Sequence, residues 1–316
     1  MKKRSAVQTG SKLYLLFIIL ALCASACKTE RQVLKNTAEL PLFGQDTSLL
    51  KDLNGAIVEI EKIEVETGFD DRVETYRMKY LSDGLQVVGF LVKPKKEGAS
   101  WPVLIYNRGG NREFGKITLR MMRYLSYLAS DGYVVLASQY RGNDGGEGKE
   151  EFGGRDVNDV LNLIEMAGSL PFTEPGKIVM LGYSRGGMMT YLAIKREAPI
   201  NAAAVVGGVT DVIQNVEERG AGMRRVVEEL AGRDEVEHKK RSAVYWPDKI
   251  NVPLLILHGE DDWRVNVSQA KKLAQELKKL GKEHKLVVFP CGDHGLNTNR
   301  PERNRLIFEW FEKHLN

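Results

Sequence analysis

Apolar and polar residues along the chain follow patterns that predict alternating strands and helices. Residues 73–81 alternate in polarity, and a Ser-Asp-Gly turn separates them from residues 85–92, which we expect to form an antiparallel partner strand. Residues 103–106 form a continuous apolar run, as expected for a strand whose two faces are both buried. Similar runs predict further strands at 133–137, 178–181, 203–206, 254–257 and 285–289. Apolar residues at helical spacing predict helices at 117–128, 157–166, 186–194, 267–280 and 305–314.

This order of elements indicates one large α/β domain. An antiparallel pair of strands followed by strand–helix repeats is typical of a mostly parallel sheet with helices on both faces. Ligands of such sheets bind at the carboxyl ends of the strands. A charged segment at 209–248, predicted to be helical, interrupts the alternation and is too short to be an independent domain. We expect the domain to span residues 59–316 and this insert to lie over an active site.

The N-terminal residues have the order of charged, apolar and small residues that is typical of a secretory signal. The apolar run at 13–22 is shorter than the roughly 20 residues that a membrane-spanning helix needs. Small residues at 24–26 offer a site for signal peptidase, whereas Ser-Ala-Cys ending at Cys27 resembles a bacterial lipobox. We expect residues 1–26 to be a signal peptide and residues 27–58 a tether. The favoured hypothesis is a periplasmic or cell-envelope protein with a lipid anchor at Cys27; simple secretion and an uncleaved anchor are the alternatives.

Charge and cysteine content narrow the classes of function. The formal net charge is +4, but residues 1–26 hold four basic and no acidic side chains, so the remainder is near neutral. No cluster of Lys and Arg is left that would indicate a nucleic-acid-binding face, and no nucleic-acid partner is predicted. Cys23 leaves with the signal and Cys27 lies at the processing site, so Cys291 has no partner and no disulfide framework is expected.

The segment Gly182-Tyr183-Ser184-Arg185-Gly186-Gly187 carries the strongest indication of chemistry. It lies between a predicted strand and a predicted helix, the context in which G-x-S-x-G indicates a nucleophile on a tight turn. The flanking glycines allow strand and helix to approach closely, and the helix N-terminus directs backbone N–H groups towards the serine. We therefore predict that Ser184 is a nucleophile.

A serine nucleophile needs a general base, usually histidine. His294 lies in a Gly-Asp-His-Gly loop after the last predicted strand, where that base is expected. His238, His284 and His314 are expected to be structural or exposed, and His258 ends a strand.

The third member should be an acid after an earlier strand, in the chain order Ser, Asp, His. Three consecutive acids, Glu260, Asp261 and Asp262, follow the predicted strand at 254–257. The acid would fix the tautomer of the histidine and stabilise its imidazolium form. These residues alone leave the choice among the three acids open.

The motifs His258-Gly259-x-x-Asp262-x-x-Val265 and Gly292-Asp293-His294-Gly295, with the segment around Ser184, resemble the catalytic domain of the prolyl oligopeptidase family of serine peptidases. Ser82-Asp83-Gly84 and Tyr140-Arg141-Gly142 are similar too, so the resemblance covers about residues 70–316. It implies an α/β-hydrolase fold and a triad of Ser184, Asp262 and His294, with Asp261 as second choice for the acid. It implies neither a metal nor an organic cofactor.

The resemblance further implies hydrolysis of peptide or aminoacyl amide bonds through an acyl-enzyme. Large family members carry an N-terminal β-propeller that screens substrates, but only about 45 residues separate Cys27 from the first hydrolase strand, too few for several four-stranded blades. We therefore expect the catalytic module alone, with an open site for a peptide or a small ester or amide. A carboxylesterase with the same triad is the alternative, because fold and triad suit both reactions. A non-catalytic binding lipoprotein is a third hypothesis, against which the presence of all three triad residues argues.

Two further parts of the site can be assigned from the sequence. The oxyanion hole should include the backbone N–H of Arg185 and a donor from the loop at 107–111, either the Arg108 side chain, where many family members have a tyrosine, or a backbone amide such as that of Gly110. By analogy with the family, the segment after the strand at 203–206 should line the acyl pocket. Its candidate residues are Val209, Val212 and Ile213. Trp246 and Trp263 are expected to pack instead of lining the site.

Overall fold

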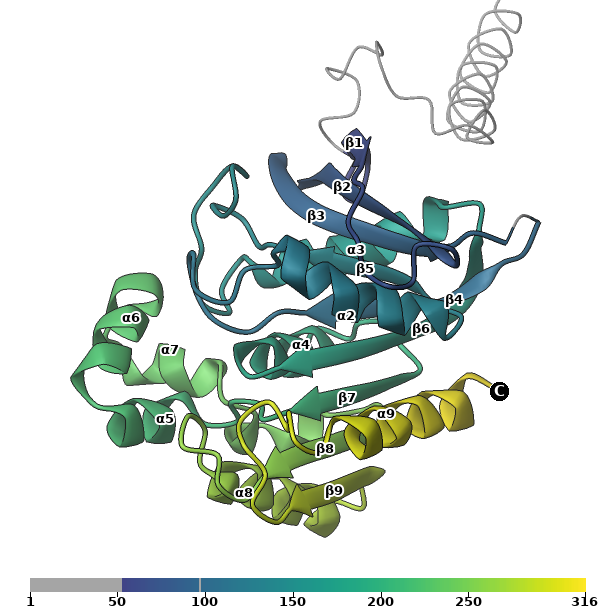
Figure 1. Cartoon of the computed structure of the whole chain (residues 1–316). Helices are drawn as coiled ribbons and strands as arrows, with labels where there is room; N and C mark the ends of the chain where they lie inside the picture. Colours follow the sequence, from purple (N-terminus) through teal and green to yellow (C-terminus); the bar gives the residue numbers. More distant parts are fainter. Residues whose placement is uncertain (1–52, 97) are drawn as a thin grey trace, which may run out of the picture. The chain divides into compact units, whose positions relative to one another are not determined.

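The computed structural model describes residues 53–96 and 98–316, whose strands form a nine-stranded sheet (Figure 1). The spatial order is β1-β2-β3-β5-β4-β6-β7-β8-β9. Strands β1, β2, β3 and β5 pair antiparallel, and all later pairings are parallel. The strands are β1 (Ile57–Lys62), β2 (Val73–Ser82), β3 (Leu85–Pro94), β4 (Trp101–Asn107), β5 (Val134–Ser138), β6 (Thr173–Tyr183), β7 (Ala202–Val206), β8 (Leu254–Gly259) and β9 (His284–Phe289). The predicted mostly parallel sheet is confirmed.

Helices cover both faces of this sheet. One face is covered by α2 (Leu119–Ser130) and α9 (Arg300–Leu315), whose apolar residues join those of the central strands in a common core. The other face is covered by α3 (Val157–Ser169), α4 (Arg185–Lys195) and α8 (Val267–Lys279). The central strands read as continuous apolar runs because both of their faces are buried; every residue of β5 and β7 is buried, for example.

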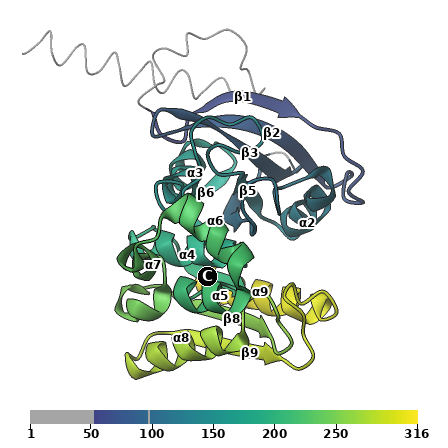
Figure 2. The ribbon, with the colours of Figure 1, turned by 90° about the vertical axis from the view of Figure 1, so that its left-hand side faces the viewer.

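The insert after β7 consists of helices at the carboxyl ends of the parallel strands. It contains α5 (Val212–Arg219), α6 (Ala221–Ala231) and α7 (Glu235–Lys240), followed by 3₁₀ turns at Ala243–Tyr245 and Pro247–Lys249. Figure 2 views the molecule from this end, with these helices facing the viewer. Parallel α/β sheets bind their ligands at this end, so the insert lies where a substrate would enter.

The structure differs from the sequence prediction at three elements. The edge strand β1 was not predicted, because its half-exposed IVEIEK segment lacks the apolar run used to find the other strands. Strand β6 begins at Thr173, five residues before its predicted start, and includes a Pro-Gly pair of the kind that usually marks a turn. Helix α9 begins at Arg300, five residues before the start predicted from its apolar residues. Pro301 is tolerated there because the N–H groups of the first helical turn have no partner within the helix.

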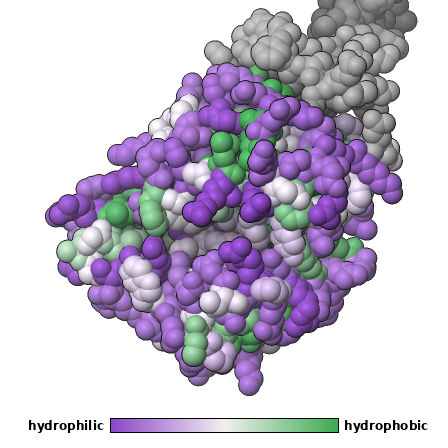
Figure 3. Space-filling view, viewed as in Figure 1, coloured by the Kyte–Doolittle hydropathy of each residue, from purple (hydrophilic) through white to green (hydrophobic). Residues whose placement is uncertain are grey.

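The predicted signal peptide, Cys27 and all but the last six residues of the predicted tether lie outside the described residues. Among residues 53–96 and 98–316, no helix is both long and apolar enough to cross a membrane. The face seen in Figure 3 is hydrophilic over most of its area and is hollowed near its centre.

Candidate functional site

Ser184 occupies the sharp turn between β6 and α4. Its backbone adopts φ 54° and ψ −121°, a conformation that non-glycine residues rarely accept and that is common at functional sites. The turn is held by the N–H of Ser184, which donates to the carbonyl of Val206 at 2.9 Å. Gly186 is required next to it, because a Cβ there would collide with the backbone carbonyl of Asn107. The local structure therefore matches the strand–turn–helix context predicted for a nucleophile.

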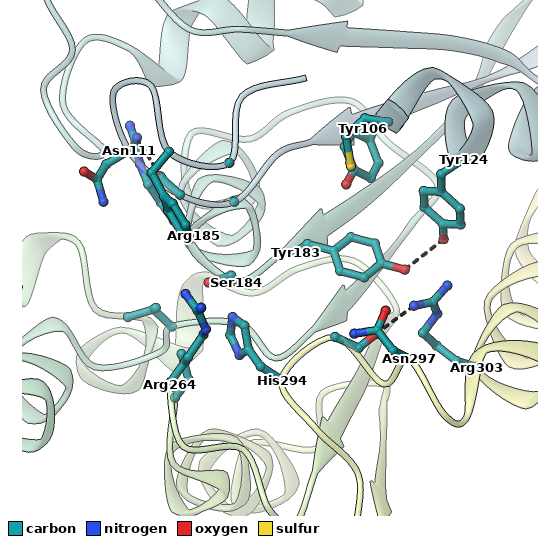
Figure 4. A pocket seen from close by; sticks show the side chains of 18 of the residues that line it. Tyr106, Asn111, Tyr124, Tyr183, Ser184, Arg185, Arg264, His294, Asn297 and Arg303 are labelled. Atoms are coloured by element: carbon teal, nitrogen blue, oxygen red, sulfur yellow. Dashed lines mark hydrogen bonds between the residues drawn. The ribbon is translucent and has the colours of Figure 1, made fainter. Parts of the chain in front are cut away.

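The structure brings His294 and Asp262 together from two different loops. Asp262 follows β8 and His294 follows β9, and Nδ1 of His294 lies 2.9 Å and 2.8 Å from the two carboxylate oxygens of Asp262. Hydrogen on Nδ1 would leave Nε2 as the acceptor nitrogen of the ring. Ser184 and His294 both line the same cavity (Figure 4), whereas Asp262 is buried and does not line it. Asp261 is exposed, and no hydrogen bond joins its side chain to the described residues.

The surroundings of Asp262 keep it ionised. Burial by itself would raise the pKa of this carboxyl, but hydrogen bonds from His258, His294 and the Val265 N–H outweigh that effect and hold its pKa well below the ordinary value. His258 is buried, and its Nε2 lies 3.2 Å from Oδ2 of Asp262 and 2.8 Å from the carbonyl oxygen of Val265. The sequence analysis placed His258 at the end of a strand and in the motif that contains Asp262, but assigned it no role in the site. Its position four residues before Asp262 was the available signal for this contact.

The loop after β4 lies against Ser184. A Cβ on Gly109 would come within 3.1 Å of the Ser184 Cβ, so the backbone approaches the serine as closely as a side chain would allow. Gly110 has φ 71°, which favours glycine. Among the described residues, no hydrogen bond uses the backbone N–H of Gly110 or of Arg185. Gly110 and Arg185 line the cavity together with Ser184, where such N–H groups would suit a developing oxyanion.

The side chain of Arg108 does not reach this position. It is fully buried and donates to the backbone carbonyls of Gln139, Gly109 and Arg112, and Glu150 lies 3.7 Å from its Nη2. The prediction of a side-chain donor at Arg108 is therefore wrong, because this guanidinium instead donates to carbonyls of its own loop. The remaining candidate donor in the loop is a backbone amide.

The side chain of Arg185 supports the same loop. Its guanidinium donates to the carbonyl of Gly110 at 3.1 Å, to Glu150 at 2.6 Å and to Asp156 at 2.7 Å. It also stacks on the rings of Tyr140 and Phe152. One residue thus offers its backbone N–H beside the nucleophile and fixes the neighbouring Gly110 with its side chain.

The cavity in front of Ser184 has a volume of about 1350 Å³. Val209 lines it, as predicted, whereas Val212 is buried in the insert and neither Val212 nor Ile213 lines it. Helix α5, which Asp211 caps, instead contributes Asn215 and Arg219 to the lining. Trp246 is packed as expected, but Trp263 is 69% exposed and lines the cavity.

The labelled lining residues lie on two sides of Ser184 and His294 in Figure 4, and we call these two groups of residues the lobes of the cavity. The first is aromatic, with Tyr106, Tyr124 and Tyr183 packed at 5.8–6.1 Å between ring centroids. The buried guanidinium of Arg303 lies over two of these rings. The second lobe contains Arg264 and the residues of α5 and α6. Sequence analysis missed the aromatic lobe, whose members come from β4, α2, the nucleophile turn and α9.

Arginine dominates the charge of the lining, which includes no Asp, Glu or Lys. Besides Arg185, the arginines of the lining are Arg120, Arg123, Arg219, Arg264, Arg300 and Arg303. Metal ligation is not indicated: the described part of the chain has no group of three or more His, Cys, Asp or Glu side chains placed to hold an ion.

Comparison with known proteins identifies the family. The model of the prolyl oligopeptidase family matches residues 120–316. The chain belongs to the prolyl oligopeptidase family. Peptidase YtmA of Bacillus subtilis is 35% identical over 240 residues, which are 74% of this chain and 90% of that protein. The resemblance drawn from the three motifs is thereby confirmed, and the chain is a serine-type peptidase.

Longer family members are similar over part of their length. Acylamino-acid-releasing enzyme 1 of Oryza sativa is 28% identical over 70% of this chain but 31% of its own length. The acylaminoacyl peptidase of Pyrococcus horikoshii superposes with a TM-score of 0.66 at 26% identity, covering 77% of this chain and 42% of that one. The prolyl oligopeptidase family member described here thus has the α/β-hydrolase fold, and its match to the longer relatives is confined to less than half of their chains.

Proposed function

We propose that this prolyl oligopeptidase family member cleaves peptide or aminoacyl amide bonds, with Ser184 as nucleophile, His294 as general base and Asp262 as the acid that orients the base. The observation that carries the proposal is the bidentate contact between Nδ1 of His294 and Asp262, beside a serine held on a strained turn in the same cavity. The Asp262 carboxylate would fix the tautomer of His294, and His294 would activate the hydroxyl of Ser184.

The proposed reaction has two halves. Nε2 of His294 accepts the proton of Ser184 as Oγ attacks the carbonyl carbon of the substrate. The N–H groups of Arg185 and Gly110 then stabilise the oxyanion. The intermediate collapses when His294 gives its proton to the leaving nitrogen, which leaves an acyl-enzyme on Ser184. Water, deprotonated by His294, releases the acyl group by the same steps in reverse.

Matched substrates test the proposed reaction. Purified protein should hydrolyse both an activated N-acylaminoacyl ester and the corresponding p-nitroanilide, with the Ser184→Ala variant as the blank. Hydrolysis of the anilide supports a peptidase, because the amide is the harder bond to break. Hydrolysis of the ester alone would favour the carboxylesterase alternative, and equal rates with Ser184→Ala would remove Ser184 from the mechanism.

We also propose that the protein is exported and lipid-anchored at Cys27, which the signal-like order of residues 1–26 supports. In a bacterial host that incorporates labelled palmitate, the full chain should carry the label and sediment with membranes. Cys27→Ser should lose the label, whereas Cys291→Ser, the matched control, should keep it. A label that survives Cys27→Ser would contradict the proposal.

A further inference from the structure

The charged side chains that line the cavity are all basic. Seven arginines line it, with no acidic residue among the lining. Arg185 is neutralised by Glu150 and Asp156, but the other six form no ion pair with any carboxylate of residues 53–96 and 98–316. Guanidinium groups that have no carboxylate partner and gather in one cavity beside Ser184 create a positive potential there, which favours a ligand that carries negative charge.

Two of these arginines are held as a pair in the lobe formed by the insert. Arg219 and Arg264 both lie against the indole ring of Trp263, at 4.9 Å and 4.7 Å from its centroid. A guanidinium nitrogen of Arg219 donates to the backbone carbonyl of Arg264 at 3.3 Å. The amide of Asn215 donates to the same carbonyl at 3.0 Å. These contacts hold both guanidinium groups against one aromatic ring.

Placing two like charges together carries an electrostatic penalty. The pKa of Arg219 is lowered, chiefly by partial burial and next by the charge of Arg264. A carboxylate bound between the two guanidinium groups would remove this repulsion and accept paired N–H donors from each. The face of Trp263 would support the methylene groups that carry such a carboxylate.

The position of this pair assigns it to the acyl part of the substrate. The loop that continues from His294 leads to Asn297 and Arg303 in the aromatic lobe, and His294 must protonate the leaving group (Figure 4). The other lobe begins at Val209, whose N–H donates to the carbonyl of Ser184, and continues into the helix that carries Arg219. Figure 4 shows the Arg264 side chain extending towards Ser184 beside the ring of His294.

We propose that Arg219 and Arg264 bind a carboxylate on the acyl side of the scissile bond, so that this peptidase prefers substrates with an acidic residue directly before that bond. This inference rests on the proposed function and names its substrate class. The same cavity would disfavour substrates that must place a protonated α-amine near Ser184, because its lining has no carboxylate to receive an ammonium group.

Hydrolysis of matched anilides tests the preference. N-acetyl-Glu p-nitroanilide should be cleaved with a kcat/KM about tenfold to hundredfold above that of N-acetyl-Gln p-nitroanilide, the range expected for a charge-assisted pair. Arg219→Gln combined with Arg264→Gln should bring this ratio close to one. Arg225→Gln is the matched control, because Arg225 is exposed on α6 and does not line the cavity. Equal rates on Glu and Gln in the unaltered protein, or a ratio that survives the double variant, would overturn the proposal.

A binding measurement separates this inference from the proposed reaction. The full chain with Ser184→Ala should bind N-acetylglutamate about tenfold to hundredfold more tightly than N-acetylglutamine, as followed by tryptophan fluorescence. Added salt should weaken the binding of N-acetylglutamate more than that of N-acetylglutamine, because the glutamate ligand carries one more negative charge. If neither anilide is cleaved but N-acetylglutamate still binds selectively, the amide-hydrolysis proposal fails and the carboxylate site stands. Equal affinity for the two ligands would contradict the carboxylate site, whatever the protein hydrolyses.

Discussion

Replacing Asp262 by asparagine should lower kcat/KM for a good anilide or ester substrate by about 10⁴-fold, the loss typical of this change in a serine triad. Asparagine keeps the shape of the side chain, so the N–H groups of Arg264 and Val265 that donate to Oδ1 can still be accepted. Its amide nitrogen, however, would donate to Nδ1 of His294 and leave hydrogen on Nε2. The histidine would then face Ser184 in the tautomer that cannot accept a proton. Initial rates with both substrates would measure the loss.

Asp261→Asn is the matched control, because it makes the same chemical change one residue earlier. The side chain of Asp261 is exposed and forms no hydrogen bond with the described residues, so we expect less than a twofold change in rate. The far-UV circular dichroism of both variants should match that of the unaltered protein. A severe loss in Asp261→Asn with normal rates in Asp262→Asn would make Asp261 the acid of the triad.

The sequence was sufficient to predict the fold because its central strands are buried on both faces. Such strands consist of uninterrupted apolar residues, as in β5 and β7, and each is followed by a helix with a clear apolar stripe. The edge strand β1 lacks this signature, since one edge and much of its surface face solvent. The start of α9 was missed for a related reason: its first turn carries Arg300 and Pro301, which contribute nothing to an apolar pattern.

The parts of the candidate site that are encoded by neighbouring residues could be predicted, whereas those that depend on contacts between distant segments could not. The sharp turn at Ser184 could be predicted because it is encoded within six consecutive residues. Arg108 was misplaced because its orientation depends on Gln139 and Glu150, which belong to other loops. The arginine pair was also missed, because a charged residue on a helix is usually solvated, and the contact of Arg219 with Trp263 joins segments that are far apart in the sequence.

Replacing Arg185 by glutamine should lower the free energy of unfolding by about 3–5 kcal/mol, the range for breaking one partner of a buried ion pair. The Arg185 side chain is 3% exposed and bridges two buried carboxylates, Glu150 and Asp156. Glutamine would remove the cation from both carboxylates; among the described residues, Arg108, at 3.7 Å from Glu150, is the one other cation within ion-pair distance of either. Urea unfolding followed by fluorescence would measure the loss. Arg305→Gln, which breaks an exposed pair with Glu309, should cost less than about 1 kcal/mol.

The pH dependence of that loss identifies its cause. Burial alone would raise the pKa of Glu150, but the charge of Arg185 and hydrogen bonds from Asn143 and the Arg112 N–H hold this pKa below its ordinary value. A carboxyl with a lowered pKa stabilises the folded protein above the pKa of the unfolded chain, and this contribution is lost as the pH falls. In Arg185→Gln the pKa of Glu150 should rise, so protonation would relieve the unpaired charge. The difference in unfolding free energy between the two proteins should therefore be largest near pH 7 and shrink towards pH 4. A difference independent of pH would instead assign the loss to the packing of Arg185 against Tyr140 and Phe152.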